Sequence, residues 1–156
     1  MSVVGDDQHA DGHWVTLTVP SHPEHMKLVR ALVAVSAETV GFAKPDINCL
    51  CLAVDEACTN IIRHAYDGDH TKTLEVHLGM HPDRMDVKLR DYGTKADPAK
   101  IKSRDLSDIR PGGLGVHFMR EIMDEVVYDT DVDVGTELRM TKKIPPGKQE
   151  SHGSQS

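Results

Sequence analysis

The feature that most constrains the fold is a long apolar stripe between Pro45 and Ala65. Apolar residues recur there every three or four positions, as on one face of an α-helix, and Asp67-Gly68 follows as a stop signal. The stripe comprises Ile47, Leu50, Cys51, Val54, Ala57, Cys58, Ile61, Ile62 and Ala65. Because such an apolar face has to be buried, we expect this helix to pack against a sheet.

Segments in which apolar and polar residues alternate provide that sheet. We expect strands over 13–19, 73–78, 85–90, 125–128 and 135–141, with the second and third joined as a hairpin. Two more helices are expected: one runs to Gly41 from a cap-like start at Ser21-His-Pro-Glu24, and the other spans 114–123. The predicted fold class is α+β: a two-layer sandwich of a mostly antiparallel mixed sheet with helices packed on one face.

The chain has the size of one domain, because 156 residues that are 38% hydrophobic can build a single core. We expect this domain to span residues 13–144, between a disordered N-terminus (1–12) and a disordered tail (145–156). No stretch approaches the roughly 20 apolar residues that cross a bilayer. The polar, acidic N-terminus is also unlike a secretory signal, so we expect a cytoplasmic protein without a membrane partner.

Charge and cysteine content narrow the possible functions. A net charge of −7 disfavours nucleic acid as a partner, since its phosphates require a clustered basic face. Cys49, Cys51 and Cys58 fall in one predicted helix, where a disulfide has poor geometry, so we expect reduced thiols. The ten histidines are scattered without a close ligand pair on one helix face, which favours surface histidines over a metal site.

Glu56 and Asn60 are the first candidate site residues. One helical turn separates them, about 6 Å along the axis, and they point away from the stripe centred on Val54 and Cys58. An amide oxygen suits Mg²⁺, and a neighbouring carboxylate can accept a proton from an attacking hydroxyl group. The alternative interpretation is that both side chains are simply solvated on an exposed helix face.

The second candidate patch is Asp91-Tyr-Gly93, at the end of a predicted strand. Asp91 continues the alternation of Val87 and Leu89, which turns its carboxylate toward the covered side of the sheet. A carboxylate there needs a donor, and the exocyclic amine of adenine is one, while Gly93 lets the backbone approach a ligand closely. The alternative is an ordinary aspartate in a turn that ends a strand.

The third candidate patch is Gly112-Gly-Leu-Gly115, just before the helix predicted over 114–123. Backbone amides and the positive end of the helix dipole converge at such a position, which suits phosphate groups. Arg110 beside it can contact a terminal phosphate or an acidic group of a partner. The alternatives are a plain flexible loop and a solvated arginine. Residues 94–111 are polar and contain two prolines, so we expect a mobile lid there.

Taken together, these patches resemble the boxes of the GHKL (Bergerat-fold) ATPases. The resemblance is carried by Glu56-Ala-Cys-Thr-Asn60-Ile-Ile, Asp91-Tyr-Gly93, Arg110-Pro-Gly-Gly-Leu-Gly115 and Gly135-Thr136, and it runs from about Trp14 to Lys143. More narrowly, the short lid and Met123-Asp-Glu-Val126 after the glycine patch are similar to the bacterial anti-sigma-factor serine/threonine-protein kinases.

This resemblance implies that the chain binds ATP and Mg²⁺. It implies Glu56 as the catalytic general base, Asn60 as the metal ligand and Asp91 as the adenine contact. The implied nucleotide-binding residues are Asn60, Asp91, Gly93, Arg110, Gly113, Leu114, Gly115 and Thr136. Kinases of this family phosphorylate a serine of a STAS-type anti-sigma antagonist, sequester a sigma factor in alternation, and often form homodimers. Arg30 loosely matches a partner-contacting arginine of the family.

The chain departs from the family pattern in two ways: one glycine of a motif is replaced, and the extra domains of larger family members are absent from this sequence. Lys95 stands at the second glycine of the Asp-x-Gly-x-Gly box, which leaves the lid geometry open. The chain has no dimerising helical hairpin with a phosphoacceptor histidine and no added domain, which disfavours sensor kinase, gyrase, chaperone and mismatch-repair roles. Two alternative functions remain: a catalytically silent nucleotide-binding module that sequesters a regulatory protein, and a small metal-binding domain built on Cys and His.

Overall fold

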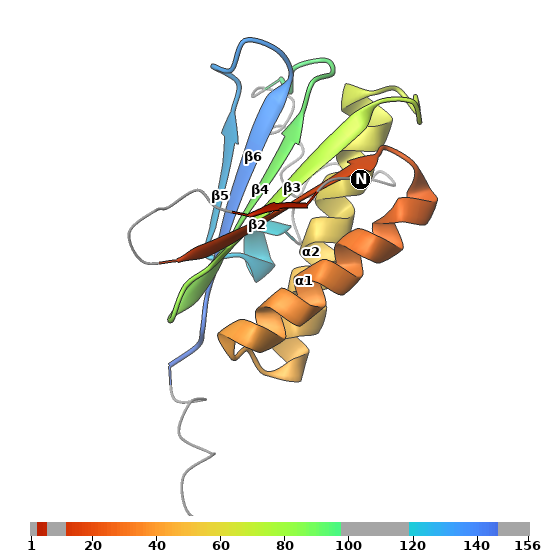
Figure 1. Cartoon of the computed structure of the whole chain (residues 1–156). Coiled ribbons are helices and arrows are strands. Elements are labelled where there is room, and N and C mark those ends of the chain that lie inside the picture. Colours follow the sequence, from red (N-terminus) through yellow and green to blue (C-terminus); the bar gives the residue numbers. More distant parts are fainter. Residues whose placement is uncertain (1–2, 6–11, 98–118, 147–156) are drawn as a thin grey trace, which may run out of the picture.

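The computed structural model of the chain describes residues 3–5, 12–97 and 119–146. The described strands form one sheet in the order β1-β2-β3-β4-β6-β5, and α1 and α2 lie side by side on one of its faces (Figure 1). The elements are β1 (Val3–Gly5), β2 (His13–Pro20), η1 (Pro23–His25), α1 (Met26–Val40), α2 (Lys44–Asn60), η2 (Ile61–Ala65), β3 (Thr73–Met80), β4 (Arg84–Asp91), β5 (Glu125–Asp129) and β6 (Thr136–Lys143).

The architecture confirms the predicted two-layer α+β sandwich, and each pairing among the described strands is antiparallel. The predicted hairpin is β3–β4, two residues longer at the end of β3 and one longer at each end of β4. On its other side β4 pairs with β6, with Asp91 opposite Thr136. This register places two residues that are 45 positions apart in the sequence side by side, at the ends of two neighbouring strands.

The core lies between the sheet and the two helices. Along β4, Met85, Val87 and Leu89 are fully buried while the residues between them face the uncovered side of the sheet. The stripe of α2 meets them through Leu50 and Val54, each no more than 1% exposed. Burial of one such side chain stabilises the fold by about 1.5–3 kcal/mol, so the stripe fixes which face of α2 points away from the sheet.

The first helix begins differently from the prediction. Ser21 does not cap it: this hydroxyl is buried and donates to the Asp69 carbonyl at 2.6 Å. Instead the short 3₁₀ turn η1 precedes α1, and His22 Nδ1 accepts from the Glu24 amide at 3.1 Å. The sequence pattern could not distinguish these, because the hydroxyl can bond a distant loop as well as a local amide. α1 ends at Gly41, as predicted.

The N-terminal segment also differs from the prediction of a disordered stretch over 1–12. Val3–Gly5 forms β1, which pairs with β2, so some backbone groups on the outer side of β2 gain hydrogen-bond partners. Three residues are too few to show a period, so their pairing is visible only in three dimensions. Residues 1–2 and 6–11 lie outside the described residues.

Part of the C-terminal predictions falls outside the described residues as well. Of the helix predicted over 114–123, residues 119–123 are described, and 119–122 are helical. Met119 and Met123 there are buried in the core. The predicted tail over 145–156 is described only as far as residue 146. Within the described ranges, no helix is long and apolar enough to cross a membrane.

Candidate nucleotide site

The site begins where α2 widens. After Asn60 the helix continues for one π-helical turn, η2, in which the Tyr66 amide donates to the Ile61 carbonyl at 3.1 Å. π-turns inside helices are often found at functional sites. The carbonyl of Ala65 at the end of this turn accepts from the Thr94 amide at 2.9 Å, just beyond β4. The end of α2 is thereby attached to the end of the strand that carries Asp91.

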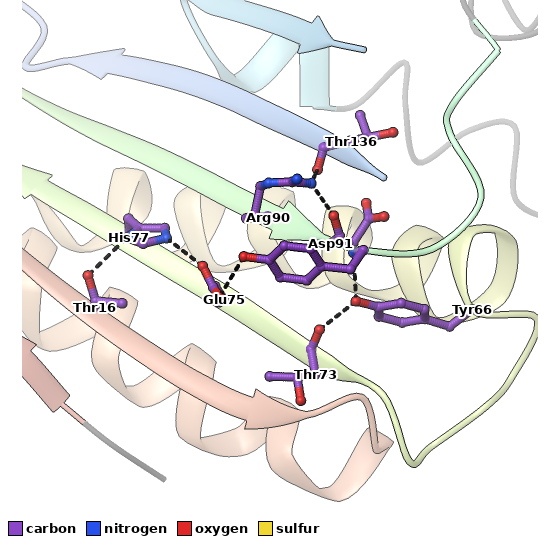
Figure 2. A network of polar contacts seen from close by, with 9 residues as sticks. Thr16, Tyr66, Thr73, Glu75, His77, Arg90, Asp91 and Thr136 are labelled. Atoms are coloured by element: carbon purple, nitrogen blue, oxygen red, sulfur yellow. Dashed lines mark hydrogen bonds and ion pairs between the residues drawn. The ribbon is translucent and has the colours of Figure 1, made fainter. Parts of the chain in front are cut away.

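A buried tyrosine makes the same connection from the other side. The Tyr66 hydroxyl donates to the Thr73 carbonyl at 2.5 Å and accepts from the Tyr92 amide at 2.9 Å, so it bridges the starts of β3 and the turn after β4 (Figure 2). Tyr66 is only 6% exposed. Burial raises its pKa, so the hydroxyl keeps its proton and can fill both roles at neutral pH.

Between these attachments lies a cavity of about 250 Å³. It is bounded by the end of α2, the turn after β4 and the start of β6, and three predicted site residues, Asn60, Asp91 and Thr136, line it together. The remaining lining residues are Ala57, Ile61, His64, Ala65, Thr94, Lys95, Ala96, Asp97, Tyr128 and Leu138. One wall is apolar, formed by Ala57, Ile61, Ala65 and Leu138, and polar side chains line most of the rest. A flat organic ring can pack on the apolar wall while polar groups fix its orientation.

Asp91 is 3% exposed and its carboxylate is held in place. The Gly93 amide donates to Asp91 Oδ1 at 3.1 Å. Burial raises the pKa of the carboxyl group, and the backbone amides of Gly93 and Thr136 and the charge of Arg90 act in the opposite direction. When ionised, this carboxylate offers the cavity only hydrogen-bond acceptors, in a fixed position.

Gly93 allows the backbone to pack closely at this place, and its predicted approach to a ligand stays a prediction. A side chain at this position would clash with the carbonyl of Ala65 and with the Tyr66 ring, so glycine allows the strand end to approach the π-turn. Gly135 is similar: its φ is +73°, and a side chain there would clash with the carbonyl of Asp91. Both glycines let backbones meet around Asp91.

Thr136 is buried beside Asp91, and its Oγ1 accepts from the Ala96 amide at 2.9 Å. This bond connects the start of β6 to the chain beyond β4. The threonine therefore supports the cavity wall through its hydroxyl and holds Asp91 through its own backbone amide.

Asn60 differs from these satisfied groups. Its Nδ2 is buried and has no hydrogen-bond partner among the residues that the structure describes. A buried polar group left without a partner costs about 1–3 kcal/mol, so a ligand in the cavity would relieve a real penalty. Nδ2 is a donor and would bind a ligand oxygen, such as one of a phosphate group, whereas the amide oxygen of the same side chain is the atom that can coordinate Mg²⁺. The residues present thus fit a magnesium nucleotide.

Glu56 is partly buried and lies one turn before Asn60 on α2, outside the set of residues that line the cavity. Its role as a base stays a prediction. Arg110, Gly113, Leu114 and Gly115 lie outside the described residues.

The cysteine and histidine chemistry can also be compared with the prediction. Cys49, Cys51 and Cys58 are free thiols, as expected, and burial raises the pKa of Cys58 to about 12. Such a thiol stays protonated at neutral pH and is a poor metal ligand. In the described ranges, no group of three or more His, Cys, Asp or Glu side chains is placed to hold a metal ion.

Sequence reasoning missed the apolar wall of the cavity. Ala57, Ile61 and Ala65 belong to the predicted core stripe, and in the structure they also line the cavity. Their spacing of four residues was the available signal. His64 and Tyr128 carried no sequence signal for this location.

Comparison with known proteins agrees with this geometry. The sequence profile of the family described as "Histidine kinase-like ATPase domain" matches residues 19–142. Serine-protein kinase RsbW of Bacillus velezensis is 32% identical over 150 residues, which cover 90% of this chain and 91% of the relative. The same-named kinase of Halalkalibacterium halodurans is 35% identical over 136 residues, 82% of each chain.

The kinase of the same name from Bacillus subtilis is 33% identical over 140 residues, 84% of this chain and 86% of the relative. The matched segments include α2 and both strand ends of the cavity. The chain therefore belongs to the histidine kinase-like ATPase family and, within it, to the group of serine-protein kinases.

Proposed function

We propose that this kinase uses ATP and Mg²⁺ to phosphorylate a serine of a STAS-type antagonist protein, and that it acts as an anti-sigma factor in a partner-switching pathway. The observation that carries the proposal is the meeting of Asn60, Asp91 and Thr136 around one cavity. The Asn60 side chain offers a donor nitrogen without a partner among the described residues and an oxygen that can coordinate a metal, and Asp91 offers a fixed acceptor. These groups would suit the phosphates, the metal and the base of a magnesium nucleotide. The kinship with serine-protein kinases supports the reaction type.

The base of ATP would lie at the Asp91 end. A purine ring would lie between the apolar wall formed by Ala57 and Ile61 and the start of β6, and its amine would donate to the Asp91 carboxylate. A phosphate at that carboxylate would be repelled, so the phosphates would point toward Asn60 and away from Asp91. Arg110 and the glycine patch over 112–115 are proposed to hold them.

Asn60 would hold the metal through its amide oxygen, and Mg²⁺ would supply positive charge that offsets the negative charge of the phosphates. Glu56 would accept the proton of the partner's serine hydroxyl as its oxygen attacks the γ-phosphorus. The bond between that phosphorus and the β–γ bridging oxygen breaks, and ADP leaves. The ionised form of Glu56 is required, so transfer should fail when this carboxylate is replaced.

Partner binding is proposed for the helical layer. Arg30 on α1 pairs with Asp55 on α2 at 2.8 Å, and half of the Arg30 side chain remains exposed. Leu28 and Val35 on the same helix are 45% and 61% exposed. Exposed apolar side chains and an exposed cation on one helix suit a protein surface, and we propose that the antagonist, the sigma factor or a second copy of the chain contacts α1.

The test is phosphorylation of purified STAS proteins with ATP labelled at the γ-phosphate. We expect label on a serine of one STAS protein, dependent on Mg²⁺ and absent with Glu56→Ala. Asp83→Asn, which changes an exposed carboxylate at the far end of β4, is the control and should transfer normally. Binding of the partner without any phosphoserine would instead support the catalytically silent module.

A further inference from the structure

The loop between β5 and β6 is held by two cations that come from the end of β4. Lys95 Nζ donates to the carbonyls of Thr130 and Val132 at 2.9 and 2.5 Å. Arg90 donates to the carbonyls of Val134 and Thr136 at 2.6 and 3.3 Å. The carbonyls of four alternate residues along one short segment are thus bonded to just two side chains, which we call the cation clamp.

The clamp reaches the cavity through both of its ends. Arg90 also donates to the carbonyl of Asp91, and Figure 2 shows its guanidinium between Asp91 and Thr136. Lys95 itself lines the cavity. The two cations therefore fix the start of β6 against the end of β4 at the residue pair that forms the proposed base-reading end.

Arg90 is in turn supported on the uncovered face of the sheet. Its guanidinium lies 4.4 Å from the centroid of the Tyr92 ring, and the Tyr92 hydroxyl donates to Glu75 at 2.8 Å. Glu75 also contacts His77 Nε2 at 3.3 Å. A stacked and charge-surrounded arginine loses little additional freedom when it bonds carbonyls, which makes it an effective positioning group.

We propose that Lys95 and Arg90 are positioning residues that make the cavity select adenine over guanine. This inference rests on the proposed ATP site. Adenine presents an amine where guanine presents a carbonyl oxygen, so a laterally fixed Asp91 accepts from the first and repels the second. Guanine carries N–H donors at the neighbouring positions of the same ring edge. If the Asp91 carboxylate could move sideways, it would accept hydrogen bonds from those donors, and guanine would bind as well.

Selectivity of this kind depends on how firmly the acceptor is held, because both purines have similar size and stacking. Thr136 holds Asp91 through its backbone amide, and the clamp holds Thr136. Loosening the segment over 130–136 therefore removes discrimination before it removes binding. Lys95, which stands at a glycine of the family pattern, is a feature of this chain that provides two of the clamp's bonds.

The test compares Lys95→Met with Lys95→Arg and with Lys142→Met. Lys142 Nζ donates to the Ile122 carbonyl at 2.8 Å, so its replacement removes a similar bond outside the clamp. Titration calorimetry with ATP and with GTP gives the ratio of their dissociation constants for each protein. We expect Lys95→Met to lower the preference for ATP by about tenfold, the size of one charge-assisted hydrogen bond, and the other two variants to preserve it.

A second readout needs no nucleotide. Amide hydrogen exchange in a peptide covering residues 130–136 should speed up in Lys95→Met and in Arg90→Met, and remain unchanged in Lys142→Met. Equal weakening of ATP and GTP in Lys95→Met, or an unchanged ratio, would overturn the clamp while leaving the ATP site intact. If the unaltered protein bound neither nucleotide, the ATP site itself would be refuted and the inference with it.

Discussion

The two ends of the cavity are built in opposite ways. At the strand end, Asp91 and Thr136 are buried and each accepts a backbone amide, and two glycines allow the backbones to meet around them. At the helix end, Asn60 leaves a buried amide nitrogen without a partner among the described residues. The polar groups at the strand end are therefore hydrogen-bonded before any ligand binds, whereas Asn60 at the helix end has a donor that a ligand could still bond.

This difference indicates how each end of the cavity would contribute to nucleotide binding. A prearranged acceptor gives selectivity, because it does not adjust to a wrong ligand. An unsatisfied group gives affinity, because the ligand removes an existing penalty. We therefore expect changes at the strand end to alter which nucleotide binds, and changes at the helix end to alter metal-dependent binding and transfer.

The largest effect is expected at Glu56, at the helix end. Glu56→Gln keeps the shape of the side chain and removes its basicity, so phosphoryl transfer should fall by roughly 10²–10⁴-fold while ATP affinity stays within a factor of about two. Single-turnover transfer and titration calorimetry measure the two quantities. Normal transfer by this variant would remove Glu56 from the mechanism, and equal loss of binding would make it a structural residue.

Asp91→Asn should break selectivity at the strand end. The amide presents a donor where a second acceptor stood, so ATP affinity should fall by about 10- to 100-fold, the range for a hydrogen bond to a charged group. In the unaltered protein, affinity should fall as pH decreases through the pKa of Asp91, which burial raises. A variant with the same affinity as the parent would show that the base lies elsewhere.

Asn60→Ala should sharpen the comparison by affecting mainly the metal-dependent binding of ATP. ATP affinity in Mg²⁺ should fall by about tenfold, and affinity in the presence of a chelator should fall less, since only the hydrogen bond from Nδ2 is then lost. Without nucleotide, the variant should be as stable as the parent or more stable, since a buried unpaired amide is removed. Thermal shift with and without Mg²⁺ checks this, and an equal loss under both conditions would refute the ligand role.

The smallest effect is on stability. Because burial raises the pKa of Asp91 in the folded state, ionisation of this group opposes folding. Below the ordinary value of 3.8 both states are protonated, and as pH rises the unfolded chain loses its proton first, so this group's contribution to stability falls. Asp91→Asn should therefore melt at a higher temperature than the parent at pH 7 in the absence of nucleotide.

That advantage should shrink as the solution becomes more acidic. Calorimetric melting over a pH series measures it. A melting temperature lower than that of the parent at pH 7 would mean that the bonds from Gly93 and Thr136 outweigh the burial of the charge.

Most of the fold could be predicted from the spacing of apolar residues. Buried side chains such as Val54, Val87 and Leu89 have to recur at helical or strand spacing, and this pattern is visible in a single sequence. It also placed Asp91 on the covered face. What it could not supply were contacts made through the backbone at long range: the short strand Val3–Gly5, the Ser21 bond to a distant carbonyl, and the carbonyls that accept from Lys95. Such contacts depend on the final positions of chain segments and leave no pattern in side-chain type.

The candidate site was predictable to the same degree. Asn60 and Asp91 were recognisable by residue type and motif order, while the apolar wall and the π-turn were not. Ile61 looks the same in a core stripe and in a cavity wall, and the widened turn ends at Ala65, which bonds the distant Thr94 amide.

The most direct test is a crystal structure of the protein with Mg²⁺ and a non-hydrolysable ATP analogue. The account predicts that the adenine amine lies within hydrogen-bonding distance of the Asp91 carboxylate and that the Asn60 amide oxygen coordinates the metal. A nucleotide bound with its base away from Asp91, or a metal without Asn60 among its ligands, would contradict it.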